Sequence, residues 1–170
     1  MSVELILFVG VQASGKTTFY RRRMQASHIH VSLDNWRGKG NVRGREERAI
    51  RAGLAAAAQS GGAVRGVVVD NTNTARQTRA RYFEMARAFT ASTGCPVRAI
   101  AYWFDCPLPE CLARNADRPM KSPAGQPYFV PAEVIASFSE MLEPPGRGEG
   151  FDEIWRIRPA PQREFLVERM

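Results

Sequence analysis

The feature that most constrains the fold is the segment 10–17, GVQASGKT, which directly follows the apolar run Val3–Val9. It fits G-x-x-x-x-G-K-[ST], a loop whose glycines let backbone N–H groups surround phosphates. Such a loop needs a buried strand before it and a helix after it, because the helix N-terminus adds a favourable dipole. The run Val3–Val9 predicts that strand, and Thr17–Gln25 predicts the helix. We therefore expect an α/β fold built around a triphosphate-binding loop.

Each residue of this loop has an expected role in holding ATP. Lys16 should reach the β- and γ-phosphates, and the Thr17 hydroxyl should bind Mg²⁺. The other residues of the loop and first helical turn that we expect to contact ATP are Gly10, Ala13, Ser14, Gly15 and Thr18.

The rest of the chain alternates short apolar runs with longer amphipathic segments, the pattern of a parallel sheet flanked by helices. Further strands are expected at Ile29–Val31, Gly66–Val69, Val97–Phe104 and Glu153–Ile157. Further helices are expected at Arg45–Gln59, Ala75–Thr93, Leu108–Asn115 and Pro131–Leu142. The segment 117–127 interrupts the pattern with Arg, Pro, Ser and Gly, which predicts a lid loop. We expect residues 1–170 to form one three-layer domain of the P-loop NTPase type.

Composition excludes several classes of protein. No apolar run approaches the roughly 20 residues that a membrane-spanning helix needs. The acidic Glu4 stands where a signal peptide would carry positive charge, so we expect a cytoplasmic protein. The three cysteines and two histidines show no metal-ligand spacing. The formal net charge of +7 favours a polyanionic partner such as nucleic acid.

Asp34 is the candidate group on the acceptor side. It follows the predicted strand Ile29–Val31, and ligands of open α/β sheets lie beyond the carboxyl ends of strands. A carboxylate there can act as general base toward an attacking hydroxyl, and Arg37, three residues on, could hold an acceptor phosphate. The alternative is that Asp34 caps a helix and Arg37 is its solvated neighbour. The nearby phosphate loop favours the first interpretation.

The strand Gly66–Val69 is followed by Asp70, the form of a Walker B segment that orients Mg²⁺. We expect Asp70 to complete a metal site with Thr17. Asn71 and Asn73 follow at the same edge and are candidate contacts to the acceptor. The alternative is a simple strand-end turn, because Asp and Asn favour such turns.

Two arginines are candidates for closing over ATP. Arg118 lies at the start of the predicted lid, and Arg114 precedes it by one helical turn. A lid arginine would stabilise charge on the transferring phosphoryl group while closure excludes water. The alternative for each is an ordinary surface charge, because arginine supplies most of the 24 basic residues.

Together these residues resemble the 5′-kinase domain of polynucleotide kinase, in the phage enzyme and in animal polynucleotide kinase-phosphatases. The strongest likeness is VVVDNTN at 67–73 followed by RARY at 79–82. The phosphate loop, the D-x-x-R pair, Arg114, Asn115, Arg118 and EGFDEI at 149–154 support it in the same order.

This resemblance implies that Asp34 is the general base and that Arg37 engages the acceptor 3′-phosphate. It likewise implies that Arg118, with Arg114 beside it, covers the ATP phosphates. Asn71 stands where the phage enzyme has aspartate. The 170 residues hold no phosphatase half, so the resemblance implies a kinase alone.

The expected function is ATP- and Mg²⁺-dependent phosphorylation of the 5′-hydroxyl end of a polynucleotide, an activity of nucleic acid repair. One alternative is a small-molecule kinase of toxin-like or metabolite type, since such enzymes share the loop, base and lid. A second alternative is a nucleotide-dependent switch that hydrolyses ATP slowly. A base for an alcohol argues against the switch, which needs none.

Overall fold

The computed structural model describes residues 2–36, 40–118 and 129–170, so Arg37 and residues 119–127 of the predicted lid lie outside the described residues. Its strands are β1 (Val3–Val9), β2 (His28–Val31), β3 (Gly66–Val69), β4 (Val97–Phe104), β5 (Glu153–Pro159) and β6 (Phe165–Arg169). Its helices are α1 (Lys16–Arg23), α2 (Val42–Gln59), α3 (Arg76–Thr93), α4 (Leu108–Ala116) and α5 (Ala132–Glu140). Three 3₁₀ turns are η1 (Leu33–Trp36), η2 (Arg147–Glu149) and η3 (Pro161–Arg163).

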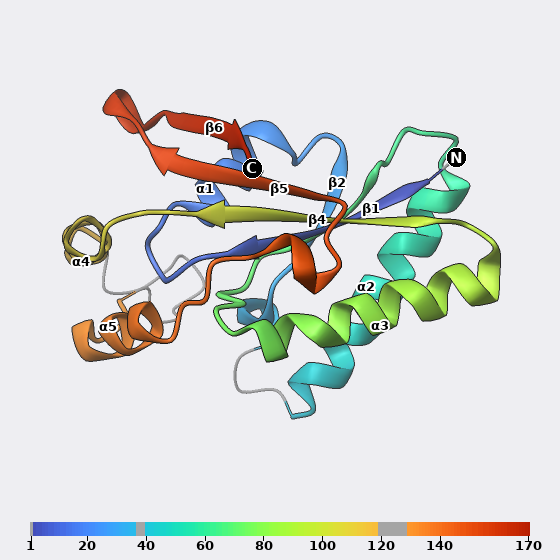
Figure 1. The fold of residues 1–170 in the computed structure, drawn as a ribbon, viewed down its shortest axis with the longest axis horizontal. Coiled ribbons are helices and arrows are strands. Elements are labelled where there is room, and N and C mark those ends of the chain that lie inside the picture. Colours follow the sequence, from blue (N-terminus) through green and yellow to red (C-terminus); the bar gives the residue numbers. More distant parts are fainter. Residues whose placement is uncertain (1, 37–39, 119–128) are drawn as a thin grey trace.

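These elements form one sheet in the order β2-β3-β1-β4-β5-β6, with helices on both faces (Figure 1). Strands β1 to β5 are parallel, and β6 pairs antiparallel with β5. The predicted α/β fold with a mostly parallel sheet is therefore confirmed. In the described part of the chain, no helix is long and apolar enough to cross a bilayer.

The central strands β1 and β3 are apolar apart from Glu4, because both of their faces are buried. Val67, Val68 and Val69 of β3 are each fully buried. One core forms where α2 and α3 cover the sheet, and it includes Leu5, Leu7, Val67, Val69, Ile50, Leu54 and Phe89. A second core forms under α1 on the opposite face and includes Ile6, Phe8, Val68 and Phe19. The sheet is thereby held between two helical layers.

Two differences from the sequence prediction exceed two residues; the other strand and helix ends differ by at most two. The sequence makes Glu153–Ile157 the last strand, whereas the structure adds β6 after the turn η3. This edge strand is short and largely exposed, so its residues lack the apolar pattern of a buried strand. Helix α2 begins at Val42 rather than Arg45, because the Asn41 side chain accepts a hydrogen bond from the Gly44 N–H at 3.2 Å.

A buried polar cluster stabilises the amino ends of the strands. The Glu4 carboxylate lies 2.9 Å from His28 Nε2, accepts a bond from Arg65 at 2.9 Å and is also approached by Arg98. Gly66 lies between Glu4 and His28 in the sheet register. A Cβ there would come 1.9 Å from the Glu4 carbonyl oxygen, so only glycine fits this close approach of β3 to β1.

Replacing Glu4 with glutamine is expected to destabilise the fold at pH 7 but not in acid. The hydrogen bond with His28, helped by Arg65 and opposed by burial, lowers the pKa of Glu4 below its ordinary value. A lowered carboxyl pKa contributes stability that is present above about pH 4.5 and is lost as the pH falls through the folded-state value. Urea unfolding should therefore show a difference in unfolding free energy between the wild type and Glu4→Gln that is smaller at pH 3 than at pH 7. A difference that stayed constant would contradict this.

Candidate active site at the carboxyl edge of the sheet

The phosphate loop runs from the end of β1 into α1, as the sequence predicts. The Gly10 N–H donates to the Thr72 carbonyl at 2.9 Å, which ties the loop to the segment after β3. Ala13 and Gly15 have φ values of 62° and 103°, in the left-handed region. A Cβ at Gly15 would also lie 3.0 Å from the Phe165 ring, so the loop packs closely against β6. The loop backbone is thus held from both sides.

Lys16 is buried inside this loop. Its ammonium donates to the carbonyl oxygens of Gly10 at 2.9 Å and Val11 at 2.6 Å. Burial lowers the pKa of Lys16, while the charge of Asp70 opposes that shift. The charges of Arg118 and Asp34 also act on Lys16, the first lowering and the second raising its pKa.

Asp70 meets the phosphate loop directly. The Thr17 hydroxyl donates to Asp70 Oδ2 at 2.6 Å, and His30 Nε2 lies 3.0 Å from the same oxygen. Burial would raise the pKa of Asp70, but the His30 bond, the Lys16 charge and the Thr17 bond together lower it. Asp70 is therefore an anion beside the loop. The sequence singled out no partner for His30, because that pairing depends on β2 lying next to β3.

These oxygen donors fit Mg²⁺. Hydroxyl and carboxylate oxygens are its preferred ligands, and Mg²⁺ in nucleotide sites keeps few protein ligands together with phosphate oxygens and water. The described residues contain no group of three or more His, Cys, Asp or Glu side chains that could hold a metal by themselves. Thr17 and Asp70 would therefore hold the ion together with the ATP phosphates and water.

Asp34 lies in η1, immediately after β2, and its side chain is exposed. Its backbone N–H donates to the Ser32 hydroxyl at 3.3 Å, so Ser32 occupies the capping position at the start of this turn. Strand β2 ends at the same edge as β3, where Asp70 lies. The arrangement leaves the Asp34 carboxylate accessible to a ligand in front of the phosphate loop.

Asn71 and Asn73 both make hydrogen bonds within the protein. Asn71 Oδ1 accepts the Leu33 N–H at 2.9 Å, and Nδ2 donates to Glu46 at 2.5 Å. Asn73 is buried, with φ 46°, and its Nδ2 donates to the Phe8 carbonyl at 2.9 Å. These bonds join η1, α2 and β1 to the segment after β3. Direct contact of either side chain with an acceptor stays a prediction.

Helix α4 brings two arginines toward the loop. Arg114 donates to Glu110 at 2.6 Å, and its guanidinium nitrogen is 3.6 Å from where a Cβ on Gly15 would lie. Arg118 follows the end of α4 and is partly buried. The helix itself packs on the loop through Cys111, in a cluster with Val11 and Ala13. Thr18, in the first turn of α1, is exposed.

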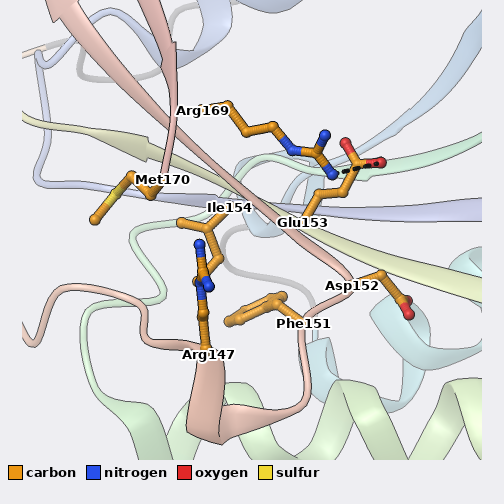
Figure 2. A pocket seen from close by; sticks show the side chains of 7 residues that line it. All are labelled: Arg147, Phe151, Asp152, Glu153, Ile154, Arg169 and Met170. Atoms are coloured by element: carbon orange, nitrogen blue, oxygen red, sulfur yellow. Dashed lines mark ion pairs between the residues drawn. The ribbon is translucent and has the colours of Figure 1, made fainter.

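A pocket of about 580 Å³ lies elsewhere, where β5 begins beside η2 (Figure 2). It is lined by Arg147, Phe151, Asp152, Glu153, Ile154, Arg169 and Met170. Glu153 and Arg169 form an ion pair across it at 3.8 Å. None of the predicted site residues lines it, so the candidate active site is the edge around the phosphate loop.

The sheet order, the phosphate loop and the Thr17–Asp70 contact define a P-loop kinase fold, as predicted from the sequence. The chain belongs to the AAA_33 family, described as an AAA domain, whose model matches residues 5–145.

Solved structures share this fold at low identity. A fungal RNA kinase is 15% identical over 95% of this chain and 77% of its own, with a TM-score of 0.61. A gluconokinase from Sinorhizobium meliloti 1021 is 19% identical over 91% of this chain and 82% of its own, with a TM-score of 0.56. A structure of AvrRxo1-ORF1:-ORF2 with ATP is 15% identical, with a TM-score of 0.62; 98% of this chain matches 57% of that one. These likenesses concern the fold.

Proposed function

We propose that this protein is an ATP- and Mg²⁺-dependent kinase that transfers the γ-phosphate to an alcohol, the 5′-hydroxyl end of a polynucleotide. The observation that carries the proposal is the exposed Asp34 in η1, just beyond the end of β2, which pairs with β3 at the edge where Asp70 bonds Thr17 of the phosphate loop. A triphosphate site with a base in front of it suits transfer to a hydroxyl group. A switch that only hydrolyses ATP needs no such base.

In the proposed reaction, Asp34 accepts the proton of the acceptor hydroxyl as its oxygen bonds to the γ-phosphorus. The bond between the γ-phosphorus and the β–γ bridging oxygen breaks, and ADP leaves with that oxygen. Lys16 would move from the Gly10 and Val11 carbonyls to the β- and γ-phosphates, and Arg118 would stabilise the charge on the transferring group. Bound Mg²⁺, held by Thr17 and Asp70, supplies further neutralisation of phosphate charge.

The polynucleotide acceptor is supported by charge and by the sequence resemblance. The formal net charge is +7, and three arginines near the start of α2, Arg43, Arg45 and Arg48, are exposed. Helix α2 packs against η1, the turn that carries Asp34. A strand whose 5′ end reaches Asp34 would therefore pass near these cations, with Arg37 proposed to hold its adjoining phosphate.

An acceptor panel with labelled ATP tests the proposal. A 5′-hydroxyl oligonucleotide should be phosphorylated with far higher kcat/KM than nucleosides, ribose or gluconate. Raising salt from 50 to 200 mM should weaken the apparent oligonucleotide affinity about tenfold or more. Binding of the arginines releases salt cations from the oligonucleotide phosphates, and that release is less favourable at higher salt. A neutral small alcohol that is preferred and insensitive to salt would instead identify a small-molecule kinase. Hydrolysis of ATP with no acceptor labelled would identify a switch.

A further inference from the structure

Helix α2 carries a fully buried carboxylate that the proposed reaction does not use. Glu46 is 0% exposed, although a buried carboxylate costs several kcal/mol unless it is paired. Its Oε1 accepts hydrogen bonds from Asn71 Nδ2 at 2.5 Å and from the Tyr82 hydroxyl at 2.9 Å. Its Oε2 pairs with the Arg81 guanidinium. Such a fully satisfied charge is held in one geometry.

Two partners on α3 hold the Glu46 carboxylate in place. Burial, reinforced by the Glu46 charge, raises the pKa of Tyr82, so the phenol stays a neutral donor. Burial would lower the pKa of Arg81, but the neighbouring Tyr82 and Glu46 oxygens raise it. The Arg81 guanidinium also donates to the Tyr82 hydroxyl at 2.7 Å. Tyr82 and Arg81 therefore remain hydrogen-bond donors to Glu46.

Glu46 is also connected, through Asn71, to the turn that carries Asp34. Asn71 donates to Glu46 through Nδ2 and accepts the Leu33 N–H through Oδ1 at 2.9 Å. Leu33 is the first residue of η1, and Asp34 is the next. Glu46 thus fixes the orientation of the Asn71 amide, and that amide fixes the start of the turn that carries Asp34.

We propose that Glu46 is a positioning residue, which acts through Asn71 to hold η1 so that the Asp34 carboxylate faces the acceptor hydroxyl. This inference rests on the proposed function, because Asp34 needs precise placement only if it takes a proton. Misplacing a reacting group by about 1 Å can cost about 100-fold in rate. Glu46 would therefore affect transfer without touching either substrate.

The test compares Glu46→Ala and Glu46→Gln with the wild type, using a 5′-hydroxyl oligonucleotide and labelled ATP. Glu46→Ala should lower kcat about 10- to 100-fold with little change in ATP affinity. Glu46→Gln keeps an oxygen for Asn71 and should recover most of kcat. Glu4→Gln is the matched control, because Glu4 is also a buried, paired carboxylate but lies at the opposite end of β1. It should lose stability and keep kcat.

A second variant covers the case in which Glu46→Ala fails to fold. Asn71→Ala breaks the link to Leu33 and leaves Glu46 bonded to Arg81 and Tyr82. It should lower kcat as much as Glu46→Ala does, and the double variant should lower it no further, because the two act in series. A rise in acceptor KM in Asn71→Ala alone would instead make Asn71 a direct substrate contact and overturn the relay.

Amide hydrogen exchange at Leu33 tests the same chain of hydrogen bonds without an activity assay, because the Leu33 N–H donates to Asn71. Glu46→Ala should speed exchange of this amide, and Glu4→Gln should not. An active wild type with unchanged kcat or unchanged Leu33 exchange in Glu46→Ala would overturn the Glu46 inference alone. If the wild type phosphorylates no acceptor but Leu33 exchanges faster in Glu46→Ala, the proposed function is overturned. The hydrogen-bonded connection from Glu46 through Asn71 to Leu33 would still hold.

Discussion

Replacing Asp34 with alanine is expected to lower kcat for phosphoryl transfer about 10²- to 10⁴-fold, the usual contribution of a general base. Asp34 is exposed in η1, outside the buried core. The loss should therefore appear in the chemical step rather than in folding. Single-turnover transfer from labelled ATP to a 5′-hydroxyl oligonucleotide measures it.

A measurement of ATP binding distinguishes loss of the general base from a general loss of structure in Asp34→Ala. Without Asp34, Lys16 keeps its bonds to the loop carbonyls and Thr17 keeps its bond to Asp70. A fluorescent ATP analogue should therefore bind the variant as it binds the wild type. Glu84→Ala is a suitable control, because Glu84 is an exposed acid on α3 away from the loop. It should retain full kcat. Full activity in Asp34→Ala would remove the base from the mechanism.

The parts of the fold that the sequence predicts well are those with local causes. Residues 10–17 predict their own local structure, because glycine and lysine at this spacing form a phosphate-binding loop between a strand and a helix. The strands β1, β3 and β4 are largely apolar runs, and the structure reproduces their predicted ends. Strand β6 escapes prediction, since an exposed edge strand has no buried face to impose a pattern.

Some residues of the candidate site can also be predicted from local sequence, and others cannot. Asp34 and Asp70 can be singled out, because Asp70 directly follows β3, Asp34 comes three residues after β2, and the carboxyl ends of parallel strands share one edge. Glu46 and His30 cannot, because their roles come from partners 25 and 40 residues away in sequence. The periodicity of α2 makes Glu46 one polar residue among several. The tertiary fold buries it against Asn71 and against Arg81 and Tyr82 of α3.

Replacing Arg79 with methionine is expected to cost about 3–5 kcal/mol of unfolding free energy, the effect of removing one partner of a buried ion pair. The guanidinium is 0% exposed and donates to both Glu149 oxygens at 2.7 Å. It also donates to the carbonyls of Asn73 and Thr74, each at 2.9 Å. Methionine fills similar volume but leaves the Glu149 carboxylate and two carbonyls without these donors.

Urea unfolding of Arg79→Met against the wild type measures this loss, and Arg51→Met is the matched control. Arg51 pairs with Glu47 one turn away on the exposed face of α2, and such surface pairs contribute about 0–1 kcal/mol. The double variant Arg79→Met/Glu149→Leu should recover part of the loss, because it removes the unpaired carboxylate as well. Equal, small effects in Arg51→Met and Arg79→Met would mean that the buried pair contributes no more than a surface one.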